Sequence, residues 1–342
     1  MIEVEKVSKI FPGTEKPAVD KISFKVEQGN ILVVVGPSGC GKTTTLRMIN
    51  RLVSPTEGKI YVAGEDTDHI NHDRLRKNIG YVIQQIGLFP HKTVEENVAL
   101  VPKMLNWPAQ KTKERVYELL ELFNLNPTEI KWKYPHQLSG GQMQRIGVAR
   151  ALAADPPIML MDEPFGAVDP IIRHHLQNEF LKLHKSLNKT ILFITHDIDE
   201  ALKMGDEIVV MNEGNIVQKD APLELLSHPK NEFVENLVGI NRGVRMLDLI
   251  AVKRLATGNK KQGEHENYLN VGKWNANNAV HISNASIGAD QPVKEALETM
   301  MREDTDTLKV VEENRVVGHI SWQEIKSHIN KISSKMVTED VD

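Results

Sequence analysis

A glycine-rich segment between an apolar run and a helix start carries the strongest chemical signal in this chain. Its residues are Gly36, Pro37, Ser38, Gly39, Cys40, Gly41, Lys42, Thr43 and Thr44. Glycines allow a tight turn whose backbone N–H groups point at phosphate oxygens, and the helix start adds a partial positive charge. Lys42 would reach the β- and γ-phosphates, and the Thr43 hydroxyl would bind Mg²⁺. An ordinary βα turn would lack this combination, so we expect a nucleoside triphosphate site.

Two acidic residues after a second apolar run would complete such a site. Asp162 and Glu163 follow residues 158–161, which have the composition of a buried strand. In open α/β sheets the carboxyl ends of the strands form the ligand-binding edge. Asp162 is placed to hold Mg²⁺ through its water shell, and Glu163 is a candidate general base for the attacking water. Both acids could instead cap the next helix, a reading that the glycine-rich segment disfavours.

A second glycine-rich helix start lies near the middle of the chain, at Ser139, Gly140, Gly141 and Gln142. One triphosphate needs one phosphate cradle, so the second cradle requires an explanation. We expect a head-to-tail dimer in which Ser139 and the Gly141 N–H bind the γ-phosphate held on the Lys42 loop of the second copy. An N-cap followed by a flexible glycine pair is the alternative.

The elements that must position these residues alternate along the chain. Buried strands are expected at 31–35, 79–83, 158–161 and 190–194. Helices are expected from 42 to about 51 and from 171 to about 187, and residues from about 91 to 154 are helical in pattern. Alternating segments at 2–4 and 22–26 predict further strands, and a hairpin turns at Glu213-Gly214. This order predicts an α/β core with a largely parallel sheet and a helical lobe.

Composition and charge exclude several classes of protein. The 342 residues are 40% apolar and 26% charged, which is typical of soluble globular proteins with about two domains. A net charge of −4 gives no electrostatic argument for a nucleic-acid partner. We expect neither a membrane-spanning segment nor a signal peptide. The single cysteine, Cys40, excludes an internal disulfide, and we read it as a small filler in the loop.

The motifs together, in this order and spacing, resemble ATP-binding-cassette (ABC) ATPases over residues 1–240, with a helical subdomain at about 91–154. The resemblance implies a P-loop NTPase core with a mainly parallel sheet, an antiparallel β-subdomain and a helical subdomain. It also implies ATP and Mg²⁺ as cofactors and a homodimer that forms head to tail on ATP.

Further site residues come from this resemblance. Gln84 would contact Mg²⁺ or the attacking water, and His196 would hydrogen-bond the γ-phosphate. Asp169 belongs to a loop that matches the family's D-loop, where Val168 replaces the commoner leucine. Phe11 would stack on adenine, since stacking needs only a π face. A solvated turn is the alternative for His196, and a core position is the alternative for Phe11.

A finer resemblance suggests what the hydrolysis drives. In importers of this family, helices of separate permease chains dock beside the glutamine, where residues 88–91 would form part of a groove or a simple loop. Residues 81–91, 155–157 and 231–235 resemble bacterial osmoprotectant importers for glycine betaine, carnitine or choline. The resemblance implies a peripheral ATPase on the cytoplasmic face of the membrane, with integral permease subunits and a separate extracytoplasmic substrate-binding protein. Quaternary ammonium cargo would be gripped by aromatic cages on that protein.

The last hundred residues differ in composition. We expect residues 241–281 to be a linker or a degenerate first copy of a cystathionine-β-synthase-type (CBS) motif. Residues 282–330 resemble one such motif, with a helix capped by Asp290-Gln291-Pro292, a hairpin, and a capping box from Ser321 to Glu324. The resemblance implies a small α+β regulatory domain and an adenine-nucleotide regulator, with dimer bracing as the alternative. Residues 331–342 would be a tail.

Three functions remain open from the sequence. The preferred one is the ATPase subunit of an osmoprotectant importer, with another small solute as a variant. The second is a soluble ABC ATPase that acts on ribosomes or DNA, although such chains usually carry two cassettes or a long coiled coil. The third is a regulatory module with vestigial hydrolysis, which intact Glu163 and His196 disfavour.

Overall fold

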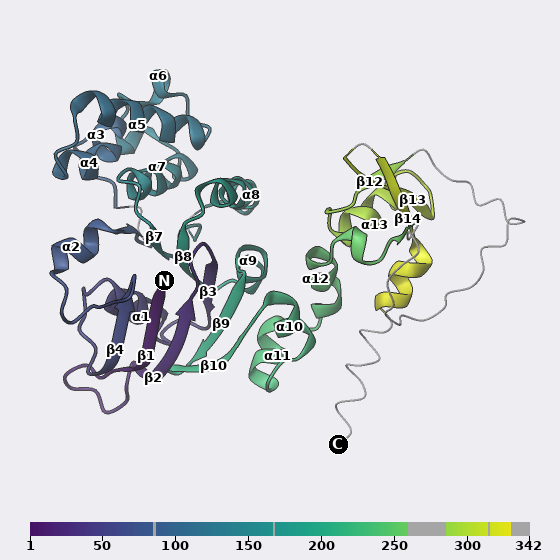
Figure 1. Ribbon diagram of the computed structural model, residues 1–342, viewed down its shortest axis with the longest axis horizontal. Helices are drawn as coiled ribbons and strands as arrows, with labels where there is room; N and C mark the ends of the chain where they lie inside the picture. The colour runs from purple at the N-terminus through teal and green to yellow at the C-terminus, as the bar shows by residue number, and fades with distance from the viewer. Residues whose placement is uncertain (85–86, 167, 259–284, 314, 330–342) are drawn as a thin grey trace, which may run out of the picture. The chain divides into compact units, whose positions relative to one another are not determined.

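The computed structural model describes residues 1–84, 87–166, 168–258, 285–313 and 315–329. Figure 1 shows the course of the chain, which divides into two compact units, Met1–Leu225 and Leu226–Asp342. Residues 259–281 of the expected linker or degenerate CBS motif, and the whole tail expected at 331–342, lie outside the described residues.

A six-stranded sheet with the order β10-β9-β3-β8-β7-β6 forms the centre of the first unit. Its strands are β3 (Ile31–Val35), β6 (Ile79–Val82), β7 (Ile158–Asp162), β8 (Thr190–Thr195), β9 (Glu207–Asn212) and β10 (Asn215–Asp220). All neighbours pair in parallel except β9 and β10, which form the expected hairpin. Every residue of β3, β7 and β8 is buried, as continuous apolar runs in central parallel strands require. The mainly parallel core is confirmed.

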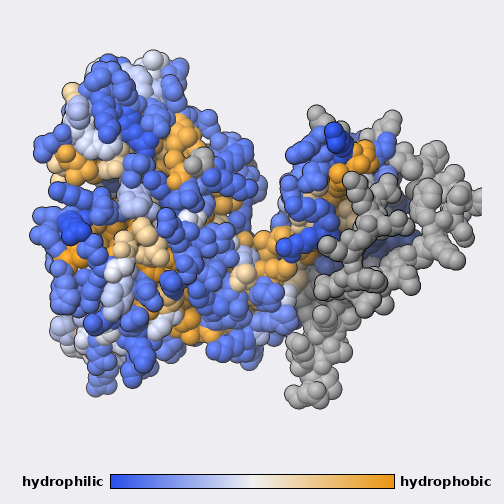
Figure 2. Space-filling model, viewed as in Figure 1, coloured by the Kyte–Doolittle hydropathy of each residue, from blue (hydrophilic) through white to orange (hydrophobic). Residues whose placement is uncertain are grey.

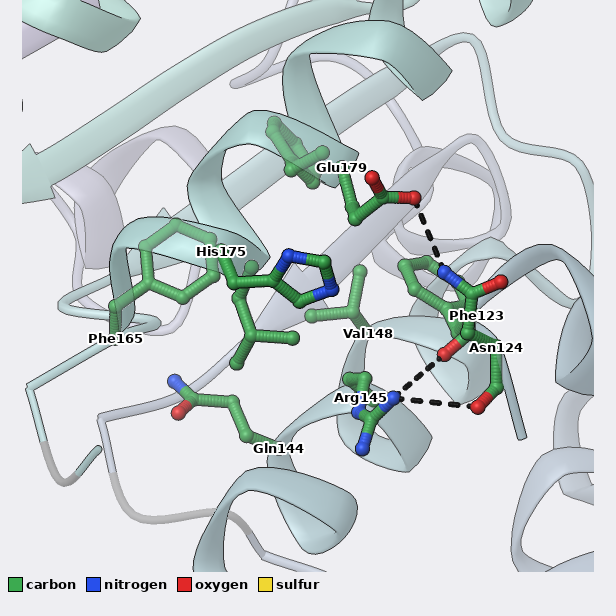
Figure 3. A pocket seen from close by; sticks show the side chains of 10 residues that line it. Phe123, Asn124, Gln144, Arg145, Val148, Phe165, His175 and Glu179 are labelled. Atoms are coloured by element: carbon green, nitrogen blue, oxygen red, sulfur yellow. Dashed lines mark hydrogen bonds between the residues drawn. The ribbon is translucent and has the colours of Figure 1, made fainter. Parts of the chain in front are cut away.

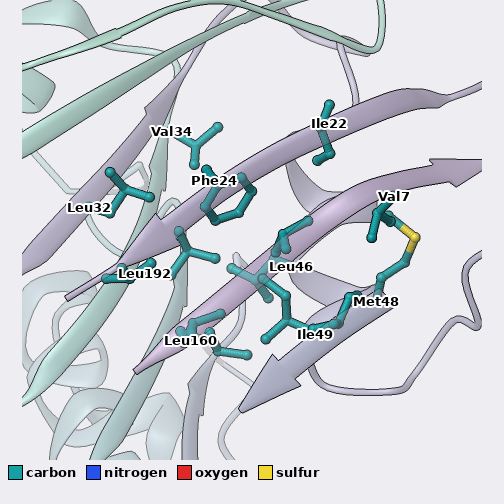
Figure 4. Packing of buried hydrophobic residues seen from close by; sticks show 14 of the residues in the cluster. Val7, Ile22, Phe24, Leu32, Val34, Leu46, Met48, Ile49, Leu160 and Leu192 are labelled. Atoms are coloured by element: carbon teal, nitrogen blue, oxygen red, sulfur yellow. The ribbon is translucent and has the colours of Figure 1, made fainter. Parts of the chain in front are cut away.

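A second, antiparallel sheet has the order β2-β1-β4-β5. Its strands are β1 (Ile2–Lys9), β2 (Val19–Val26), β4 (Glu57–Val62) and β5 (Glu65–Asp66). Helix α1 (Lys42–Ile49) places Leu46, Met48 and Ile49 in one apolar cluster with side chains of both sheets (Figure 4). These three side chains are fully buried, and each such burial contributes about 1.5–3 kcal/mol. The glycine-rich segment that precedes α1 is therefore fixed by the core.

The helical subdomain appears in Figure 1 as a separate lobe at the top left. It consists of α3 (Val94–Val98), α4 (Leu100–Met104), α5 (Ala109–Leu122), α6 (Pro127–Ile130), the 3₁₀ turn Pro135–Gln137 and α7 (Gly140–Leu152). The buried residues of α5 include Val116, Leu119 and Leu120, whose i, i+3, i+4 spacing places them on one apolar face. The remaining helices of this unit are α2 (His72–Lys77), α8 (Pro170–Leu187), α9 (Ile198–Met204) and α10 (Pro222–Ser227), whose last two residues fall in the second unit.

The second unit contains a four-stranded sheet with the order β11-β14-β13-β12. Its elements are α11 (Glu232–Val238), α12 (Arg242–Leu249), the 3₁₀ turn Val252–Arg254, β11 (Thr257–Gly258), β12 (Ser286–Gly288), α13 (Val293–Arg302), β13 (Thr307–Glu312), β14 (Arg315–Ser321) and a helix at 322–329. The α+β character of this unit matches the expectation.

Two expected helix caps of the second unit have different outcomes. Ser321 and Glu324 form the predicted capping box, since the Ser321 N–H donates to Glu324 Oε2 at 2.7 Å and the Glu324 N–H donates to Ser321 Oγ at 3.3 Å. The expected cap on α13 is wrong, because its N-cap is Pro292, which makes no side-chain cap hydrogen bond. Asp290 instead pairs with Lys253 Nζ at 2.5 Å.

In the described part of the chain, no helix combines the length and apolar character needed to cross a bilayer. The face drawn in Figure 2 is mainly hydrophilic, with apolar residues in separate patches.

Candidate ATP site

The glycine-rich loop between β3 and α1 needs glycine for steric reasons at two of its positions. Gly41 has φ 106°, and a Cβ there would lie 2.5 Å from the Ala18 carbonyl oxygen. A Cβ on Gly36 would lie 2.1 Å from the Met211 carbonyl oxygen. Gly41 is also the N-cap of α1 and provides no side-chain cap. The first N–H groups of α1 are therefore free of a side-chain cap, as an anion-binding helix start requires.

Lys42 lies inside this loop and is only 6% exposed. Its Nζ donates to the Gly36 carbonyl at 2.7 Å and to the Pro37 carbonyl at 2.9 Å. Cys40 is 3% exposed, and its Sγ lies 3.8 Å from the same ammonium group. A buried ammonium needs polar partners, and these carbonyls hold the charge at the centre of the loop, where phosphate oxygens would approach. Cys40 fills space beside it, as expected.

The side chains of Thr43, at the start of α1, and Asp162, at the end of β7, contact each other. The Thr43 Oγ1 hydroxyl donates to Asp162 Oδ1 at 3.0 Å. Asp162 is 3% exposed, and burial raises the pKa of its carboxyl while the Thr43 hydrogen bond opposes this shift. In the described ranges, no group of three or more His, Cys, Asp or Glu side chains could hold a metal ion. A hydroxyl and one carboxylate nonetheless fit Mg²⁺, which takes most of its ligands from water and phosphates in such sites.

The side chains of Gln84, Glu163 and His196, which we expect around the attacking water and the γ-phosphate, are in contact. Gln84 Nε2 donates to Glu163 Oε2 at 2.9 Å, and His196 Nδ1 lies 3.2 Å from Glu163 Oε1. They follow β6, β7 and β8, which are neighbours in the sheet, so their side chains converge at one edge. Both carboxylate oxygens of Glu163 are thus occupied by groups that can orient them.

Glu163 also has an unusual backbone. Its φ is 46°, in the left-handed region, and its N–H donates to the Ile194 carbonyl at 3.0 Å. A left-handed conformation costs a non-glycine residue about 1–2 kcal/mol. Strained backbone conformations cluster at functional sites, where they fix the direction of a side chain. Here it accompanies the carboxylate that we expect to act as the general base.

Ser139 caps α7 within its own chain. The Gln142 N–H donates to Ser139 Oγ at 3.2 Å, and the Ser139 N–H donates to Gln142 Oε1 at 3.0 Å. These bonds match the N-cap alternative drawn from the sequence. Ser139 and Gly140 are also exposed, which leaves the start of α7 accessible to a second copy.

The remaining sequence-predicted residues lie at the ends of elements. Phe11 is 37% exposed, with Lys9 Nζ 5.2 Å from the centre of its ring. Phe11 is therefore not a core residue, and its ring is accessible to a ligand. Asp169 directly precedes α8, and its carbonyl accepts the Arg173 N–H at 2.8 Å. Thr44 is half-buried in the first turn of α1.

Two side chains whose roles the sequence did not reveal hold residues 87–93 in place. Asn97, which is fully buried on α3, accepts the Phe89 N–H at 2.8 Å and donates to the Lys92 and Thr93 carbonyls at 3.0 and 2.9 Å. Arg150 Nη1 on α7 donates to the Gly87 carbonyl at 2.7 Å. The only sequence signal was an asparagine at an inward-facing position of a helix. These contacts give the segment a fixed shape in which Phe89 stays 39% exposed.

Figure 3 shows a separate cavity between α5, α7 and α8, lined by Phe123, Gln144, His175 and other side chains. Its free volume is about 20 Å³, which is room for about one water molecule and not for a nucleotide. Gln144 Oε1 is buried there with no hydrogen-bond partner in the described structure. Arg145 Nη1 donates to the Phe123 carbonyl at 3.0 Å and ties α7 to the end of α5.

A phosphate loop, a buried carboxylate bound to its threonine and a glutamate at the sheet edge define a P-loop ATPase. Residues 19–166 match the family model described as ABC transporter. The chain is 44% identical over 335 residues to the glycine betaine/carnitine/choline transport ATP-binding protein OpuCA of Bacillus subtilis (strain 168), covering 97% of this chain and 81% of that protein. The chain belongs to the ABC transporter family, as an ATP-hydrolysing cassette.

Other relatives agree with this assignment. The chain is 52% identical over 254 residues to the osmoprotectant import ATP-binding protein OsmV of Salmonella typhimurium (strain LT2), covering 73% of this chain and 66% of that protein. Among solved structures it is similar to the dimeric ATP-binding cassette MJ0796 bound to ADP and Pi. That match has a TM-score of 0.59 and 33% identity, and it covers 65% of this chain and 99% of the other.

Proposed function

We propose that this chain is the ATPase subunit of an importer for small quaternary ammonium osmoprotectants such as glycine betaine, carnitine or choline. The convergence of Gln84 and His196 on Glu163 carries the hydrolytic part of this proposal. The cargo class is supported by two relatives, 44% and 52% identical to this chain, that are named for transport of glycine betaine, carnitine and choline and for osmoprotectant import.

In the proposed mechanism each residue has a separate task. The loop N–H groups and Lys42 bind the phosphates, and Phe11 stacks on adenine. Glu163 accepts a proton from the attacking water, while Gln84 and His196 orient the water and the γ-phosphate. Thr43, Asp162 and Gln84 would hold Mg²⁺, which neutralises charge on the phosphates.

We infer a shared site between two copies. Ser139, Gly140, Gly141, Gln142 and Asp169 would contact the nucleotide held on the Lys42 loop of the second copy. The exposed start of α7 is compatible with this arrangement. Hydrolysis would then require that ATP bring the two copies together. The free energy of ATP binding would in this way drive the movement of one copy toward the other.

The chain would act through other proteins. The exposed Phe89, held in the segment that Asn97 organises, is our candidate contact for an integral permease subunit. Such a contact would place the ATPase on the cytoplasmic face of the membrane. A separate extracytoplasmic protein would capture the cargo.

We propose that residues 1–240 are the ATP-binding domain and that residues 282–330 form a CBS-like regulatory motif. An adenine nucleotide could be its ligand. Both carboxylate oxygens of Glu324 already accept bonds inside the unit, from Ser321 and from the Thr257 hydroxyl. This occupancy counts against the Glu324 carboxylate as a contact for such a nucleotide.

The function is tested by reconstitution with an integral permease and an extracytoplasmic binding protein from the same organism that co-purify with this chain. Vesicles that contain the complex and internal ATP should take up labelled glycine betaine, carnitine or choline, and unlabelled proline should not compete. The Glu163→Gln complex is the matched control and should show no uptake. Transport of an unrelated solute would contradict the cargo class, and co-purification with ribosomes instead of a permease would contradict the importer.

A further inference from the structure

Arg173, in the first turns of α8, contacts both loops that flank the proposed active site. Its Nη2 donates to the Val168 carbonyl at 3.0 Å, immediately before Asp169. Its Nη1 lies 3.6 Å from Asp197 Oδ2, immediately after His196. One guanidinium therefore joins the segment expected to meet the second copy to the segment that carries His196.

Asp197 is well suited to transmit a displacement. Its Oδ2 faces Arg173, while its Oδ1 accepts the N–H groups of Asp199 and Glu200 at 2.9 and 3.2 Å. It is thus the N-cap of α9 as well as the partner of Arg173. Because His196 is its chain neighbour, a shift of the Asp197 carboxylate moves the backbone on which the His196 ring is mounted.

A second contact, one helical turn further along α8, fixes the same pair of helices. Gln177 Nε2 donates to Glu200 Oε1 at 2.9 Å, and both residues are 6% exposed. Residues four apart share a helix face, so Arg173 and Gln177 contact the start of α9 from the same side of α8. With two attachments, the start of α8 and the start of α9 behave as one body.

The position of the Arg173 guanidinium carries a free-energy cost. Its Nε is buried with no hydrogen-bond partner among the described residues. A buried donor without a partner is unfavourable, so its placement needs compensation or a function. The hydrogen bond to Val168 and the ion pair with Asp197 supply the compensation and fix which loops the side chain connects.

We propose that Arg173 is a positioning residue that couples contact of the second copy at Asp169 to the placement of His196 on Glu163. This inference rests on the proposed roles of Asp169 and His196. Contact at Asp169 displaces the start of α8, Arg173 carries the displacement to Asp197, and His196 is set for hydrolysis. Binding of ATP by the Lys42 loop does not depend on this connection.

The test compares steady-state ATP hydrolysis by full-length variants. Arg173→Met removes both bonds and keeps the aliphatic stem, so kcat should fall between about ten- and a hundredfold, as a small misplacement at a reacting centre does. KM for ATP should stay within about twofold, because nucleotide binding is untouched. Asp197→Asn keeps an oxygen for the helix cap while removing the charge, and it should lower kcat in the same direction.

A double-variant cycle separates positioning from a general structural role. If Arg173 acts through His196, then Arg173→Met combined with His196→Ala should lower kcat no further than His196→Ala alone. Independent effects would multiply, and that result would overturn the proposal. Arg173→Lys is the conservative control and should restore part of the lost kcat, because its ammonium can still pair with Asp197.

The dimer gives a readout that distinguishes this proposal from the one on which it rests. Glu163→Gln with ATP should dimerise by size-exclusion chromatography, with or without Arg173→Met. If Glu163→Gln alone stays monomeric, the shared-site proposal fails. If Glu163→Gln dimerises and Arg173→Met hydrolyses ATP at the wild-type rate, the coupling role of Arg173 fails. Should Arg173→Met not fold, Arg173→Lys and Asp197→Asn carry the same comparison.

Discussion

The side-chain amide of Gln84 donates to the carboxylate of Glu163 at 2.9 Å, although the two residues are 79 positions apart in the chain. Glu163 is the first residue after β7, and its other carboxylate oxygen faces His196. The carboxylate is therefore fixed from both sides. A fixed base needs little reorganisation when a proton moves to it, which favours catalysis.

Glu163→Gln should abolish most of the turnover. Removal of a general base lowers rates by about 100- to 10,000-fold, so kcat for ATP hydrolysis should fall at least about 100-fold. The amide keeps the size of the carboxylate, so ATP binding should persist and the ATP-bound dimer should accumulate. Phosphate release and size-exclusion chromatography measure the two effects.

Glu163→Asp is the matched control for this change. It keeps the base but withdraws it by one methylene, so its loss should be smaller than that of the amide. Unchanged turnover in Glu163→Gln would remove Glu163 from the mechanism.

Gly41→Ala should damage the phosphate loop. A Cβ at Gly41 would meet the Ala18 carbonyl oxygen at 2.5 Å, and its φ of 106° disfavours any other residue. We expect a loss of roughly 1–3 kcal/mol in the free energy of unfolding and a large loss of ATP affinity. Urea unfolding and a fluorescent ATP analogue measure the two quantities.

Gly64→Ala is the matched control for the loop. Gly64 has φ 81°, but a Cβ there meets nothing within 4 Å. This variant should lose some stability through its backbone and keep ATP affinity. An equal loss of affinity in both variants would contradict a specific role for the loop at Gly41.

The sequence predicted the parts of the fold that local patterns determine. Continuous apolar runs such as Ile31–Val35 become central parallel strands, because both faces of such a strand must be buried. The glycine-rich loop and the pair Asp162-Glu163 were also predicted, because each motif consists of residues that are neighbours in the sequence. The capping box from Ser321 to Glu324 was predicted for the same reason.

Contacts between segments that are distant in the chain could not be predicted from the sequence. Arg150 and Arg173 look like ordinary polar positions on helices, and only the tertiary fold brings Arg150 to the Gly87 carbonyl and Arg173 to Asp197. The expected cap by Asp290 failed for a related reason. Lys253, 37 positions earlier, takes its carboxylate in an ion pair that no local pattern reveals.

Asn97→Asp should loosen the segment that displays Phe89. The carboxylate can still accept the Phe89 N–H, but it cannot donate to the Lys92 and Thr93 carbonyls. Burying a charge next to two carbonyls should lower the free energy of unfolding by roughly 1–3 kcal/mol. ATP hydrolysis by the free chain should change little, while binding to the permease should weaken.

Asn106→Asp provides the control for the chemical change itself, because Asn106 is exposed. It should leave both stability and permease binding close to wild type. If Asn97→Asp binds the permease normally, the segment around Phe89 is not the docking contact.

Glu200 should make the free energy of unfolding depend on pH. Because Glu200 is buried, its contribution should fall as the pH rises. Burial raises the pKa of the Glu200 carboxyl, and the nearby Asp197 charge adds to this, while bonds from Thr195 and Gln177 oppose it. A raised pKa in the folded state means that folding favours the protonated form. The associated stability is complete below the unfolded-state pKa and is lost as pH rises through the folded-state pKa.

The comparison with Glu200→Gln isolates this contribution from those of all other titrating groups. The uncharged amide has no such pH dependence, so the free energy of unfolding of the wild type should fall relative to Glu200→Gln as the pH rises from about 4 to 8. Urea unfolding at several pH values gives this difference directly. A difference that stays constant with pH would mean that Glu200 is ionised in the folded protein as readily as in the unfolded chain. A wild type that gains stability relative to Glu200→Gln as the pH rises would mean that it is ionised more readily in the folded protein.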